Sequence, residues 1–68
     1  MDAESRLKKM VKETGEVHSV YGGFEVAVMK PTLFPWYRVI HELLEIGQNV
    51  WMSKKEGTIL VRSEPKEE

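Results

Sequence analysis

The sequence predicts an α+β fold in which a four-stranded antiparallel sheet has two helices packed on one face. Two segments with helical spacing of apolar residues alternate with two pairs of short segments typical of strands. A glycine-containing turn separates the strands of each pair, which is typical of a β-hairpin. The order helix, hairpin, helix, hairpin favours a single antiparallel sheet with both helices on the same side.

The first helix is expected over residues 2–14. Asp2 or Ser5 could cap its beginning, and Gly15 is expected to end it. Its apolar side is a thin stripe, which indicates a surface helix lying on a larger layer. The stripe consists of Ala3, Leu7, Met10, Val11 and Thr14.

The first hairpin is expected from strands at residues 16–21 and 24–30. Gly22-Gly23 would form the turn, because glycine adopts positive φ at little cost. In the second strand Phe24, Val26 and Val28 face one way. The opposite face is only half polar, so this strand is either central in the sheet or covered on both sides.

The second half begins after Pro31, which ends the preceding strand. Thr32 is expected to cap a helix whose first turn accepts Pro35, and Gly47 is expected to end that helix. Residues 49–53 and 58–63 are expected strands around a turn at 54–57. The helix has a broad apolar arc made of Trp36, Val39, Ile40, Leu43, Leu44 and Ile46.

Size and composition indicate one small domain, residues 1–63, followed by a disordered charged tail at 64–68. The chain has 68 residues, 31% of them charged, and a net charge of −1. The tail is acidic, so the remaining domain is weakly basic. No apolar run is long enough to span a membrane, and the acidic start is unlike a signal peptide. The absence of cysteine favours a cytoplasmic location.

The sequence predicts no enzyme activity, no cofactor and no metal site. His41 and Glu45 lie four residues apart on one helix face, which could hold a metal ion but is more often a solvated pair. Serines and histidines are present, but none stands in a nucleophile motif. A core of this size also leaves little room for a substrate pocket.

Aromatic and basic residues suggest a small non-enzymatic protein associated with nucleic acid, which either binds single-stranded DNA or RNA or has a regulatory role. Trp51 could stack on a base if it shares a face with Arg62 across the second hairpin, while cations would contact phosphates. The alternative is that both tryptophans are core residues and the lysines only solubilise a turn. The predicted nucleic-acid-binding residues are Arg38, Trp51, Lys54, Lys55 and Arg62.

The rival hypothesis is a protein-interaction module, either an accessory subunit or a small inhibitor of a larger protein. It predicts an exposed aromatic patch formed by Phe34, Trp36 and Tyr37. The second helix and strand 24–30 offer more apolar surface than a monomer of this size covers. We therefore also expect a homodimer.

Overall fold

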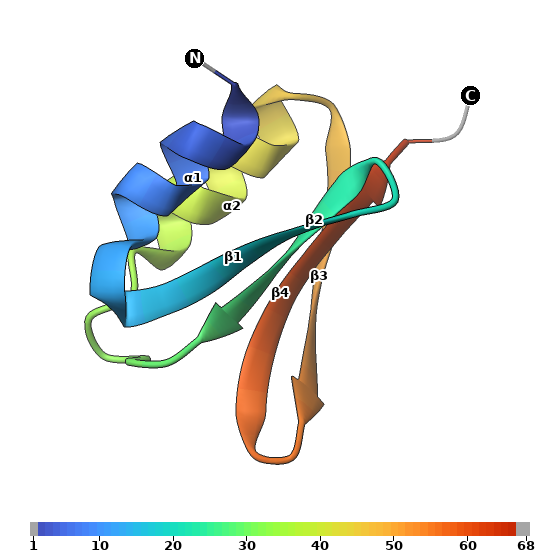
Figure 1. Cartoon of the computed structure of the whole chain (residues 1–68). Helices are drawn as coiled ribbons and strands as arrows, with labels where there is room; N and C mark the ends of the chain where they lie inside the picture. The colour runs from blue at the N-terminus through green and yellow to red at the C-terminus, as the bar shows by residue number, and fades with distance from the viewer. Residues whose placement is uncertain (1, 67–68) are drawn as a thin grey trace.

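The computed structural model describes residues 2–66 of the chain. Helix α1 (Ala3–Val11) continues into a short 3₁₀ turn, η1 (Lys12–Thr14), and strands β1 (Gly15–Val20) and β2 (Gly23–Val28) follow. Helix α2 (Trp36–Glu45) precedes strands β3 (Gln48–Lys55) and β4 (Thr58–Pro65). The two helices lie side by side on one side of the strands (Figure 1). No helix within residues 2–66 is both long and apolar enough to cross a membrane.

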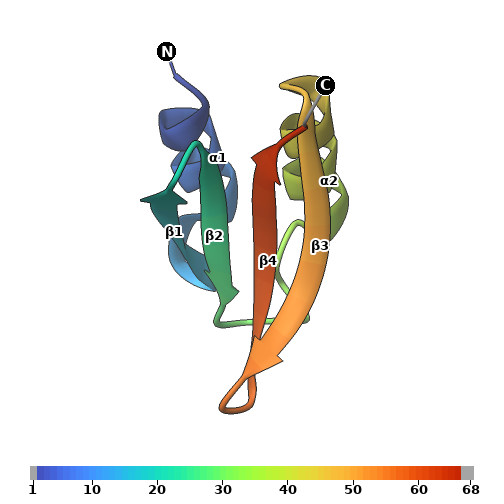
Figure 2. The ribbon, with the colours of Figure 1, turned by 90° about the vertical axis from the view of Figure 1, so that its right-hand side faces the viewer.

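The four strands form one antiparallel sheet in the order β1-β2-β4-β3. Each hairpin pairs its own two strands, and the pairing of β2 with β4 joins the hairpins at the centre of the sheet. Figure 2 shows both helices behind the sheet, with α1 packed against β1 and α2 against β3. The predicted α+β fold is therefore confirmed, and β2 is a central strand covered on one face.

The core lies between the helices and the sheet face that they cover. At its centre Val26 of β2 pairs with Val61 of β4, and both are fully buried. Leu7 from α1 and Leu43 from α2 reach the same cluster. Burial of each such aliphatic side chain contributes about 1.5–3 kcal/mol, so these contacts hold the helices on the sheet. The cluster also contains Val11, Val17, Val28, Phe34 and Val39.

Each half of the chain repeats the order of one helix and one hairpin. Because β2 and β4 are central antiparallel neighbours, a two-fold axis perpendicular to the sheet relates the halves approximately. Polar side-chain contacts also connect the halves. Arg6 Nε of α1 lies 2.7 Å from Glu42 Oε2 of α2, and Gln48 Nε2 donates to the Gly22 carbonyl at 3.1 Å.

The first hairpin turn lies one residue earlier than predicted. Val20 pairs with Gly23, so Tyr21 and Gly22 are the two turn residues. Gly22 has a φ of 73°, which favours glycine, whereas Gly23 is the first residue of β2.

Gly23 is required for a different reason, the close approach of β2 to β4. A Cβ atom at this position would lie 2.0 Å from the backbone carbonyl oxygen of Ser63. A backbone atom in a central strand cannot move away as the end of a flexible side chain can. On the next residue of β2, the Phe24 amide donates to Ser63 Oγ at 3.1 Å. The absence of a side chain at Gly23 therefore lets the two central strands meet.

The second hairpin has a two-residue turn in place of the predicted turn over 54–57. Its residues, Glu56 and Gly57, have φ of 52° and 82°, the combination found in type I′ turns. Lys54 and Lys55 therefore belong to β3, and this hairpin extends beyond the rest of the sheet (Figure 2).

The beginning of α2 also differs from the prediction of a Thr32 cap. Residues 31–34 form turns, and Pro35 occupies the cap position without a side-chain hydrogen bond. The Trp36 indole Nε1 donates to the Pro31 carbonyl at 2.9 Å. This bond ties the first helical residue back to the beginning of the loop.

Strand β4 is longer than predicted and takes up part of the expected tail. Glu64 pairs with Asn49 and Pro65 with Gln48, so residues 64 and 65 lie in the sheet. The Lys66 amide is 3.4 Å from the Gly47 carbonyl. Residues 67–68 of the predicted tail lie outside the described residues.

Asp2 rather than Ser5 caps α1. Its Oδ1 accepts a hydrogen bond from the Ser5 amide at 2.8 Å. This bond to the charged carboxylate lowers the pKa of Asp2 below its ordinary value of 3.8. Lys8 and Lys9 lie in the last turn, where cations interact favourably with the helix dipole.

Substitution of Gly23 by alanine should destabilise the fold by about 3 kcal/mol, because its methyl group collides with the Ser63 carbonyl. Urea denaturation measures the change. Gly57→Ala is the matched control, since a Cβ there has nothing within 4 Å and the cost is only the left-handed backbone, about 1 kcal/mol. Equal losses in the two variants would contradict a steric role for position 23.

Protonation of Asp2 should remove its contribution to stability. The pKa is lowered in the folded state, so this contribution is full above 3.8 and is lost as the pH falls through the folded value. In the Asp2→Asn variant the new amide side chain would still cap the helix but would not titrate. Urea midpoints measured on both sides of this range should therefore fall more for the wild type than for the variant. Parallel pH profiles would show that the cap is not coupled to ionisation.

Candidate interaction surface

The sheet face away from the helices is uncovered in the described part of the chain, and Figure 2 looks onto it. Side chains alternate along each strand, so the register that turns Val26 and Val61 toward the helices turns Glu25 and Arg62 away. We call this surface the open face. It consists of Glu16, His18, Val20, Gly23, Glu25, Ala27, Asn49, Trp51, Ser53, Lys55, Thr58, Leu60, Arg62 and Glu64.

One row of the open face crosses all four strands, because residues paired in register lie side by side. This central row consists, from β1 to β3, of His18, Glu25, Arg62 and Trp51. Arg62 Nε lies 3.3 Å from Glu25 Oε2, and the Arg62 guanidinium carbon lies 5.9 Å from the centre of the Trp51 ring. The guanidinium is thus held between a carboxylate and the face of an indole.

Trp51 is the large aromatic residue of this surface. Its direct pairing with Arg62 confirms that the two side chains share a face across the second hairpin. Its neighbour Met52 pairs with Val61 and therefore points to the helix side. Trp51 remains 40% exposed, which makes it available for contact with another molecule.

The predicted phosphate-binding cations do not gather in one place. Arg38 lies exposed on α2, on the other side of the sheet. Lys54 and Lys55 occupy the end of β3, and alternation directs only Lys55 to the open face. Of the predicted cations, the structure therefore places Lys55 and Arg62 on the face of Trp51.

The charge of the open face is close to balanced. Its carboxylates are Glu16, Glu25 and Glu64, and its cations are Lys55 and Arg62. One of the two cations is already paired with a carboxylate. This distribution does not create the positive potential that attracts a phosphate backbone.

The predicted aromatic patch at the beginning of α2 is divided between core and surface. Phe34 is only 4% exposed and belongs to the core, so its assignment to an interface is corrected. Trp36 is half-buried, with its ring edge-to-face against Phe34 at 4.8 Å. Tyr37 is 78% exposed and stacks on His41 at 5.7 Å. Of the three predicted residues, only Tyr37 is fully presented to solvent.

The sequence interpretation missed Glu25 and His18 as members of the surface around Trp51. Alternation with Phe24 and Val26 marks Glu25 as facing away from the core. However, its position beside Arg62 follows from the pairing of β2 with β4, which local patterns do not contain.

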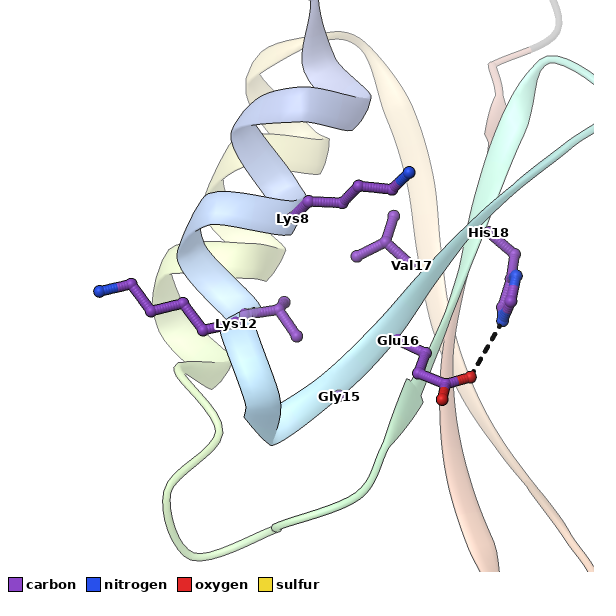
Figure 3. Close-up of a pocket in the computed structure, with 7 residues that line it drawn as sticks. Lys8, Lys12, Gly15, Glu16, Val17 and His18 are labelled. Atoms are coloured by element: carbon purple, nitrogen blue, oxygen red, sulfur yellow. Dashed lines mark ion pairs between the residues drawn. The ribbon is translucent and has the colours of Figure 1, made fainter.

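A second feature is a shallow cavity of about 300 Å³ between α1 and the edge of β1. Figure 3 shows Lys8 and Val17 on the helix side of β1, with Glu16 and His18 directed away from it. Lys8 Nζ is 3.2 Å from Glu4, and His18 Nε2 is 3.5 Å from Glu16. The imidazole–carboxylate pair of His18 and Glu16 at the rim of the cavity is therefore directed away from α1.

The His41–Glu45 pair has the helical spacing noted from the sequence. His41 Nε2 lies 3.8 Å from Glu45 Oε1, and both side chains are well exposed. Within residues 2–66, no group of three or more histidine, aspartate or glutamate side chains is arranged to hold a metal ion.

Comparison of the chain with protein-family models, with curated proteins and with solved structures found no match.

Truncation of Phe34 and of Tyr37 to alanine should distinguish the core aromatic residue from the surface one by their effects on stability. Phe34→Ala should lower the free energy of unfolding by about 3–5 kcal/mol, because it leaves a cavity between the helices and the sheet. Tyr37→Ala should change it by no more than about 0.5 kcal/mol, since that ring lies in solvent. Urea denaturation monitored by tryptophan fluorescence measures both. A small loss for Phe34→Ala would contradict its assignment to the core.

Proposed function

We propose that this protein is a non-enzymatic protein-interaction module, cytoplasmic in location, that binds its partner through the open face. The observation that carries the proposal is Trp51, a partly exposed indole on the edge strand β3 that lies beside Arg62 on the uncovered sheet face. Tryptophan and arginine are among the residues most enriched at the energetic centres of protein interfaces. A guanidinium that an ion pair holds near the face of an indole is partly preorganised for contact with a partner.

The composition around Trp51 supports a protein partner over a nucleic acid. Ala27 and Leu60 lie side by side in the row next to the central row, and they extend the apolar area. The mixed charges around them suit a partner that also carries both signs. A phosphate chain would meet more carboxylates than cations, and it would have to compete with Glu25 for Arg62.

The two histidines do not converge on one site, and this is the basis for proposing a role without catalysis. His18 and His41 lie on different elements, and each is beside a carboxylate of its own element. General acid–base chemistry needs such groups to converge on a substrate within hydrogen-bond reach.

Affinity purification from the native host with the wild-type chain as bait tests the proposal. The bait should capture a stoichiometric protein partner that both Trp51→Ala and Arg62→Glu lose. Tyr37→Ala is the matched control, because it removes an exposed aromatic ring from a different surface and should retain the partner. Circular dichroism of each variant verifies that it is folded.

Titration of labelled single-stranded DNA and RNA at low salt provides the second arm. The proposal expects no binding. Binding that weakens with rising salt and depends on Trp51 would instead support a nucleic-acid partner. A protein partner that both open-face variants retain would rule out this surface.

A further inference from the structure

We infer that the open face binds a second copy of this chain, with the two sheets stacked face to face about a two-fold axis parallel to the strands. This inference rests on the proposed function of the open face and names its partner. The observation behind it is that acidic and basic residues occupy different halves of the central row.

The geometry of such a pair follows from the strand order. A two-fold axis that runs along the strands, midway between β2 and β4, exchanges the left and right sides of the sheet. It therefore places β2 of one copy over β4 of the other, and β1 over β3, while each row stays over the same row. Stacked sheets pack about 10 Å apart with their strands within about 30° of each other, which keeps the central rows opposed.

This arrangement brings opposite charges of the two copies together along the central row. Glu25 faces Arg62 of the second copy, and by symmetry Arg62 faces Glu25 of that copy. Each copy already pairs these two groups at 3.3 Å, so stacking converts two separate pairs into one network of four charges.

The side chains around Glu25 and Arg62 also fit together in this face-to-face pair. In the next row, Ala27 lies over Leu60 of the second copy, and a small side chain meets a larger one. At the ends of the central row, His18 lies over Trp51 of the second copy and covers the exposed indole. Rotation about an axis across the strands would instead place Glu25 over Glu25, so charge selects the axis along the strands.

The size of the face sets the strength of this association. Four strands about 4.8 Å apart and about six residues long cover roughly 400 Å² in plan. Stable interfaces bury about 800 Å² on each partner, and weak ones less than about 600 Å². We therefore expect a dimer that dissociates on dilution.

Sedimentation velocity of the wild-type chain from micromolar to millimolar concentration should show a monomer–dimer equilibrium. Glu25→Arg should remain monomeric, because both copies then present two cations at this place. Arg62→Glu should also remain monomeric, because both copies present two carboxylates. An equimolar mixture of the two variants should form a heterodimer, since two cations then face two carboxylates across the axis.

The double variant Glu25→Arg/Arg62→Glu should dimerise like the wild type, and it keeps an ion pair within each copy if either single variant folds poorly. Arg38→Glu, which makes the same charge change on α2, is the matched control and should dimerise normally.

A wild-type chain that stays monomeric throughout would overturn the inference. If such a monomer still captures another protein in a Trp51-dependent manner, the proposed function stands without the second copy. Dimers that persist in both single variants, or single variants that do not associate when mixed, would place self-association on a different surface or geometry and overturn the inference as well. If Trp51→Ala and Arg62→Glu also leave capture of every partner unchanged, the proposed function fails with it.

Discussion

The pairing of β2 with β4 is the interaction on which the rest of this structure depends. Each hairpin closes locally through a two-residue turn, but an isolated hairpin is marginally stable in water. Joining β2 to β4 places Val26 against Val61 and creates one surface broad enough for both helices. Gly23 allows this contact because the Ser63 backbone occupies the space that a side chain would need. The two halves therefore share one core on the sheet that their central strands join, and the contact between α1 and α2 adds to it.

The same pairing decides what the open face displays. Side chains alternate along a strand with a period of two, so the register that buries Val26 and Val61 must turn Glu25 and Arg62 outward. The two α-helices within residues 2–66 both lie on one side of the sheet, which leaves the other side uncovered there. The core and the candidate surface are thus two consequences of a single register. A slip of one residue between β2 and β4 would turn the core side chains of one hairpin to the face away from the helices.

Local patterns in the sequence were sufficient to predict the helices and hairpins. They did not predict which strands of the two hairpins lie next to each other. The alternation from Phe24 to Val28 and the glycines near each turn predict the hairpins, because strand period and positive φ are local properties. The contact between Glu25 and Arg62 depends on strand order, which involves residues far apart in the chain. Phe34 lies in an irregular loop, where no periodicity distinguishes a buried ring from an exposed one.

The two halves of the fold differ most where packing does not constrain them. Val26 and Val61 occupy equivalent positions in the two halves. Each lies three residues after the first residue of its strand, and the core requires an aliphatic side chain at both positions. The outward equivalents differ, since Glu25 of the first half corresponds to Leu60 of the second. Stability of the monomer does not require an exposed indole and Leu60 on one half and Glu16 and Glu25 on the other. Exposed apolar groups instead favour association, and this asymmetry is a further argument for the proposed contact with another molecule.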